Sequence, residues 1–168
     1  MKNLSSLLLL LALISLPAWA QTREDQIKTA FVYQFIRYVE WPQPLSTARV
    51  AVIGEGEFAD ALMSLEGRDA DGVRIEVHPV TDMAELGGYD VVFVSHSRAS
   101  QIPAILEQLR GKPVLTVSDS PGFCKVGGGI ELTELQNRLR YRVAREALSQ
   151  AGLKPGDALL KSALTDPQ

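Results

Sequence analysis

Cysteine, histidine and long apolar runs are scarce in this 168-residue sequence, and each shortage excludes a class of site. Cys124 is the only cysteine, so no disulfide can form within the chain. The two histidines, His78 and His96, stand in neither an H-E-x-x-H motif nor a Cys/His cluster, so we expect no metal and no cofactor. The net charge of −3 gives no electrostatic footprint for nucleic acid.

The one long apolar stretch lies at the N-terminus and predicts export. Residues 1–20 carry Lys2 as their one charge, an apolar run over residues 7–14, and the small-residue site Ala18-Trp19-Ala20. This arrangement is typical of a secretory signal peptide, and the run is too short for the alternative, a retained membrane anchor. We therefore expect cleavage after Ala20 and a single domain over residues 21–168.

A strongly amphipathic helix is predicted over residues 27–42, in the segment IKTAFVYQFIRYVEWP. Its core-facing stripe consists of Ile27, Phe31, Phe35, Tyr38 and Val39, widened by Val32 and Ile36. The opposite, polar strip consists of Gln26, Thr29, Tyr33, Arg37 and Glu40. Pro42 should end the helix, because the residue before a proline is pushed out of the α region. We expect the rest of the domain to cover this helix on more than one side.

Short β-rich runs alternate with segments of helical spacing through the remaining chain. Strands are predicted at residues 49–53, 73–77, 89–94 and 113–117, and the apolar segment 89–94 should be central. Residues 130–135 and 139–143 predict a C-terminal antiparallel β-hairpin. The alternation of strands and helices predicts an α/β fold, a three-layer Rossmann-like sandwich with a mostly parallel, mixed sheet.

Small and polar residues follow three of these strands and should gather at one edge of the sheet. They are Gly54, Ser95, His96, Ser118 and Asp119. Because open α/β sheets bind ligands at the carboxyl ends of their strands, this edge is a candidate small-molecule site. A hydrolase triad of Ser118, His96 and Asp119 can also be imagined, but no G-x-S-x-G motif supports it.

The segment GEGEFA (residues 54–59) fits a dinucleotide-binding fingerprint in its usual place between a strand and a helix. Its two glutamates would repel a phosphate group at the start of the helix. A tight strand-to-helix turn is therefore the better interpretation.

Two groups of residues indicate a protein-binding surface. Alternation along the strand 139–143 places Arg138, Arg140 and Arg142 on one face, which would suit an acidic partner. The second group, near the end of the first helix, consists of Tyr33, Arg37, Glu40 and Trp41. Tyrosine and tryptophan are frequent interface anchors. The alternative for the arginines is a solvated strand face, and the alternative for Trp41 is that it closes the end of the core.

Four blocks of the sequence together resemble the YfiR-like family. They are KTAFVYQFIRYVEWP (residues 28–42), VAVIGEGEF (50–58), PVLTVSDSPGF with GGGI (113–130), and AGLKPGDALLKSA (151–163). Their order along the chain makes the resemblance far more specific than any one block. The resemblance implies a small periplasmic α/β protein of Gram-negative bacteria. The disulfides of the family's namesake cannot form here, because Cys124 stands alone.

The resemblance also implies a function without catalysis. Such a protein would bind and repress the periplasmic sensory domain of an inner-membrane signalling protein, a diguanylate cyclase, and so restrain cyclic-di-GMP output and biofilm formation. An outer-membrane lipoprotein would relieve the repression, and a homodimer is plausible. The alternative is a periplasmic small-molecule-binding or transport-accessory protein that uses the sheet edge. A hydrolase ranks third.

Overall fold

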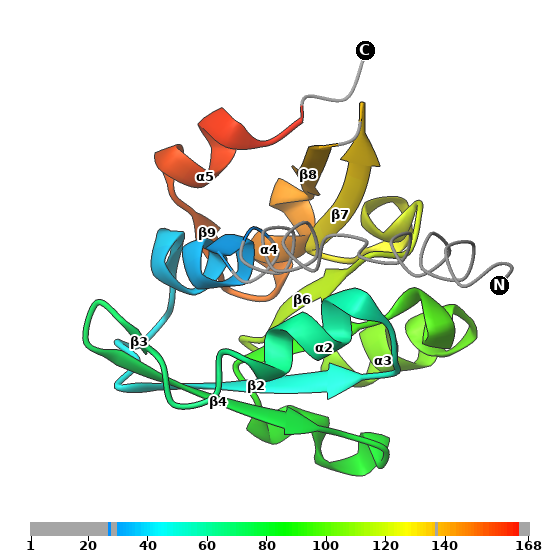
Figure 1. The fold of residues 1–168 in the computed structure, drawn as a ribbon, viewed down its shortest axis with the longest axis horizontal. Helices are drawn as coiled ribbons and strands as arrows, with labels where there is room; N and C mark the ends of the chain where they lie inside the picture. The colour runs from blue at the N-terminus through cyan, green and yellow to red at the C-terminus, as the bar shows by residue number, and fades with distance from the viewer. Residues whose placement is uncertain (1–26, 28–29, 137, 165–168) are drawn as a thin grey trace, which may run out of the picture.

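Seven strands form one curled sheet in the computed structural model, which describes residues 27, 30–136 and 138–164. In spatial order they are β3 (Asp69–Ala70), β4 (Val73–Pro79), β2 (Thr47–Ile53), β5 (Val91–Val94), β6 (Leu115–Ser118), β7 (Ile130–Leu135) and β8 (Arg138–Val143). The strands from β4 to β7 pair in parallel, whereas the edge strands β3 and β8 pair antiparallel. The α/β class, the mixed and largely parallel sheet and the terminal hairpin are confirmed (Figure 1). The strand order confirms the central position of β5.

Helices cover both faces of the sheet, which gives the predicted three layers. Along β2, Val50 and Val52 face one buried cluster, whereas Ala51 and Ile53 face the other. The first cluster is covered by the helix over residues 30–38, α2 (Glu57–Met63), α4 (Arg145–Gln150) and α5 (Asp157–Ser162). The second is covered by the 3-10 helix η1 (Met83–Gly88) and by α3 (Ile102–Leu109). Two further 3-10 helices, η2 (His96–Gln101) and η3 (Phe123–Val126), follow β5 and β6.

The first helix packs against the hairpin through its aromatic residues. Phe35 is fully buried, and its ring meets Tyr141 of β8 edge-on, with centroids 5.1 Å apart. Phe31 makes a similar contact with Tyr141 at 5.3 Å. The prediction for Ile27 is wrong: its side chain is 48% exposed, and among the described residues the first ring contact with the hairpin is made by Phe31. The prediction that Tyr33 lies on the polar strip is wrong, because this residue is half-buried against the core.

The helix ends at residue 38, earlier than the predicted stop at Pro42. Val39–Glu40 instead form the short strand β1, which pairs antiparallel with β9 (Lys154–Pro155). The indole N–H of Trp41 donates to the Ile36 carbonyl at 3.2 Å. This bond satisfies one of the carbonyl groups that the end of a helix leaves open. The chain after the first helix is therefore tied both to the helix, through Trp41, and to the segment before α5, through β1 and β9.

The predicted signal peptide, residues 1–20, lies outside the described residues, as do Gln26 and Thr29 of the polar strip. Within the part of the chain that the structure describes, no helix has both the length and the apolar character needed to cross a bilayer.

Candidate functional site

Hydrogen bonds join the loops after β2 and β5 at the carboxyl edge of the sheet. Ser95 Oγ donates to the Glu55 carbonyl at 2.5 Å, and the Glu55 N–H donates to Ser97 Oγ at 2.9 Å. Gly54 has a φ of +97°, and a Cβ at this position would stand 2.6 Å from Ser97 Oγ. Glycine is required here, because it adopts this conformation without strain and leaves room for the neighbouring loop. The GEGEFA segment thus forms a tight turn that leads into α2.

The loops after β5 and β6 are joined in the same way. Ser118 is fully buried; its Oγ donates to the Val94 carbonyl at 2.6 Å and accepts the Ser120 N–H at 3.0 Å. Asp119 Oδ1 accepts the backbone N–H of His96 at 2.6 Å. The structure therefore brings all the predicted edge residues together, but as partners in contacts between loops. The hydroxyl imagined as a nucleophile already donates its proton to a backbone carbonyl.

The group at the end of the first helix makes contacts within the domain. Arg37 Nε lies 2.5 Å from Asp71 Oδ2, and Lys154 Nζ lies 3.1 Å from Glu40 Oε2. Trp41 is half-buried and donates its indole N–H to the helix, as described above. The polar groups of these three residues thus have partners inside the fold.

The three arginines of β8 share one face, as the alternation predicts. Their cross-strand neighbours on that face are Leu135, Thr133 and Glu131. Arg138 and Arg140 are exposed, and Leu135, opposite Arg138, is 51% exposed. Arg142, at the other end of the row, forms an ion pair with Glu131 at 3.2 Å. We term the surface made by Thr133, Leu135, Arg138 and Arg140 the arginine face.

The two predicted groups do not form one surface. Successive side chains of a strand point to opposite faces of the sheet, and the first helix packs on the face that carries Tyr141. The arginine face is therefore on the other side of the hairpin from the helix that carries Arg37 and Trp41.

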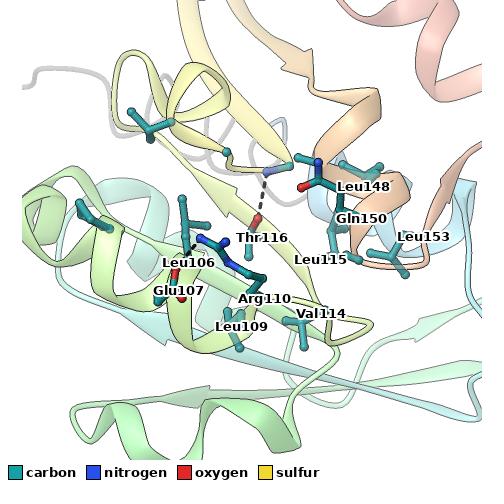
Figure 2. A pocket seen from close by; sticks show the side chains of 17 residues that line it. Leu106, Glu107, Leu109, Arg110, Val114, Leu115, Thr116, Leu148, Gln150 and Leu153 are labelled. Carbon is teal, nitrogen blue, oxygen red and sulfur yellow. Dashed lines mark hydrogen bonds and ion pairs between the residues drawn. The ribbon is translucent and has the colours of Figure 1, made fainter.

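Two hollows lie beside the helices, and sequence reasoning missed both. The larger, of about 420 Å³, lies between α3 and α4 (Figure 2). Leucine side chains from both sides line it, among them Leu106 and Leu148. Glu107 and Arg110 on its rim form an ion pair with each other, so their charges are mutually compensated. The smaller hollow, of about 330 Å³, lies where η3, the end of β8 and the end of α5 meet.

Burial changes the pKa of two side chains outside the predicted sites. Burial raises the pKa of Asp90, although the Arg49 N–H, which donates to Asp90 Oδ2 at 2.8 Å, opposes the shift. Burial also raises the pKa of Tyr141, whose hydroxyl donates to the Leu159 carbonyl at 2.8 Å. In the described part of the chain, no cluster of three or more His, Cys, Asp or Glu side chains is placed to hold a metal ion.

Comparison with protein families identifies the domain. A family model described as YfiR/HmsC-like matches residues 25–163. The chain belongs to the YfiR/HmsC-like family. All four sequence blocks noted above, from residue 28 to residue 163, lie inside the matched range.

A solved structure shares the fold of this YfiR/HmsC-like chain. It is the crystal structure of a conserved domain protein from Vibrio cholerae O1 biovar El Tor str. N16961, with a TM-score of 0.53 and 12% sequence identity. The alignment covers 81% of this chain and 58% of that chain, so this chain spans little more than half the length of the protein that it matches. At this identity the likeness concerns the fold alone.

Proposed function

We propose that this YfiR/HmsC-like protein is a non-enzymatic periplasmic regulator that binds and represses the periplasmic sensory domain of an inner-membrane diguanylate cyclase. Membership of the family supports the class of function. A repressor of this kind needs no catalytic residues, because it needs only to bind one state of its partner more tightly than the other. Its action would lower cyclic-di-GMP output and restrain biofilm formation.

The arginine face is the observation that carries the proposal. It combines two exposed arginines, Arg138 and Arg140, with the exposed side chain of Leu135. Arginine beside apolar surface is typical of the centres of protein interfaces. The chain as a whole is acidic, so this local positive surface would select and steer an acidic partner. We therefore propose that an acidic surface of the partner binds the arginine face.

The group at the helix end, with Tyr33, Arg37, Glu40 and Trp41, is a weaker docking surface, because the polar groups of Arg37, Glu40 and Trp41 are paired within the fold and Tyr33 is half-buried. A homodimer formed by pairing two β8 edges is also disfavoured. Such pairing would bring the arginines of both copies side by side, and like charges on adjacent strands repel. An outer-membrane lipoprotein that relieves repression would have to compete with the cyclase for the arginine face, or move this face away from the cyclase.

The sheet edge supports a small-molecule role less well. Ser95 and Ser118 donate their hydroxyl protons to backbone carbonyls, and Asp119 accepts a backbone N–H. Gly54 leaves space that the neighbouring loop fills. A ligand at this edge would have to break these contacts before it could use the same groups.

A pull-down with matched variants tests the proposal. The C-terminally tagged full chain is expressed in its own host, captured from detergent-solubilised membranes, and analysed by mass spectrometry. We expect it to recover an inner-membrane protein with a cytoplasmic cyclase domain. Arg140→Glu should lose this protein, whereas Arg110→Glu, which reverses another exposed charge just after α3, should retain it. Equal recovery by both variants would overturn the assignment of the arginine face, and recovery of no cyclase by the wild type would overturn the function.

A further inference from the structure

We propose that the smaller hollow binds a small organic carboxylate, independently of which protein partner the domain has. Its lining comes from η3, the end of β8, the start of α4 and the end of α5. The lining residues are Cys124, Lys125, Arg142, Val143, Ala144, Arg145, Leu160, Ala163 and Leu164. Its volume of about 330 Å³ suits a small ligand, because ligand pockets start at roughly 300 Å³.

The charges in this hollow are of one sign. Lys125, Arg142 and Arg145 line it, and none of the described residues in its lining is acidic. Glu131, behind the lining, pairs with Arg142 and offsets one positive charge. Lys125 and Arg145 remain in excess, although the chain carries a net charge of −3. A concave site lined by one sign of charge concentrates ions of the opposite sign.

Arg142, one of the cations that line the hollow, is held in place by the buried carboxylate of Glu131. The Glu131 side chain is only 6% exposed, and its Oε2 accepts the Cys124 N–H at 3.1 Å. Its Oε1 lies 3.2 Å from Arg142 Nη1, so the guanidinium of this lining residue is held by a buried carboxylate. A charged donor held in place by a buried partner loses little freedom when a ligand binds.

The apolar wall is fixed as well, through Tyr141. The Leu164 N–H donates to the Tyr141 carbonyl at 2.8 Å, and the Tyr141 hydroxyl donates to the Leu159 carbonyl at 2.8 Å. These two bonds hold the end of α5 against β8. Leu160 and Leu164 are half-buried there and present apolar surface to the hollow. The combination of cations with an apolar wall matches a carboxylate that has an apolar body better than it matches inorganic phosphate.

The larger hollow offers an internal contrast. It is also partly apolar, but its rim charges, Glu107 and Arg110, pair with each other (Figure 2). It therefore has no excess charge at its rim with which to select an anion. Arg110 is 78% exposed, and its replacement provides a control that removes a cation without touching the smaller hollow.

Titration followed by two-dimensional ¹H–¹⁵N NMR of the purified protein tests the proposal, with sodium benzoate as the probe. We expect saturable shifts of the backbone amides at residues 124–125, 142–145 and 160–164. Benzyl alcohol, which lacks the charge, and inorganic phosphate, which lacks the apolar body, should bind at least about fivefold more weakly. Lys125→Gln and Arg145→Gln, at exposed positions, should each weaken benzoate binding by about fivefold. Arg110→Gln should leave the affinity unchanged.

Four results would overturn the proposal. The first is the absence of saturation at about 10 mM benzoate, and the second is a set of shifts centred on other residues. The third is equal binding of benzoate and benzyl alcohol, which would show an apolar pocket without anion recognition. The fourth is unchanged affinity in both Lys125→Gln and Arg145→Gln.

Discussion

Replacing Gly54 by alanine should destabilise the domain more than the same change at Gly72. Both glycines have a positive φ, +97° and +87°, so alanine at either position costs about 1–2 kcal/mol in backbone strain. At Gly54 the new Cβ would also stand 2.6 Å from Ser97 Oγ and 2.9 Å from Ser95 Cβ, whereas nothing lies within 4 Å at Gly72. Overpacking adds about 1–3 kcal/mol, so we expect a loss of about 2–5 kcal/mol for Gly54→Ala and about 1–2 kcal/mol for Gly72→Ala.

Urea unfolding followed by circular dichroism measures both losses as changes in the free energy of unfolding. The slope of that free energy against urea concentration should be unchanged, because the same surface is exposed on unfolding. The difference between the two variants isolates the contact between the loops after β2 and β5. Equal losses at Gly54 and Gly72 would refute the reasoning, since they would show that these loops can separate at no cost.

Three further substitutions test burial and hydrogen bonding. Burial raises the pKa of Asp90, so the folded state favours the protonated carboxyl, and the stability that this provides is lost as pH rises through the folded pKa. Asp90→Asn does not titrate, so its free energy of unfolding in urea titrations should rise relative to that of the wild type between about pH 4 and pH 7. A difference that stays constant over this range would contradict the prediction. Tyr141→Phe leaves the Leu159 carbonyl without its donor and should cost about 1–2 kcal/mol in the same assay, so no change would show that water replaces the donor. Phe35→Ala removes a fully buried ring and should cost about 3–5 kcal/mol, whereas a loss under about 1 kcal/mol would mean that the first helix does not anchor the core.

Sequence periodicity predicted well which face of each element is apolar. Phe35 and Val39 are buried as expected, and Ile75 and Val77 of β4 alternate with less buried neighbours. Periodicity reports on a single element, however, and not on where its neighbour ends. The exposure of Ile27 depends on how far the rest of the domain extends along the helix, and the residue pattern of the helix alone does not give that information.

The sheet edge shows a similar division. The rule that parallel strands end at one edge correctly brought Ser95 and Ser118 into the same region. That their hydroxyls donate to backbone carbonyls depends on loop conformation, which residue types alone do not determine. The smaller hollow was missed for a related reason. Lys125 and Arg145 are twenty positions apart, and only the path of η3 beside the end of β8 brings them together.

The central claim is that this YfiR/HmsC-like protein restrains a diguanylate cyclase. The most direct test measures cellular cyclic-di-GMP by mass spectrometry in the native host, with the gene deleted and then restored as wild type, Arg140→Glu or Arg110→Glu. The account predicts that deletion raises cyclic-di-GMP, that wild type and Arg110→Glu lower it again, and that Arg140→Glu does not. An unchanged cyclic-di-GMP level after deletion, under conditions in which wild-type cells contain the protein, would contradict the account.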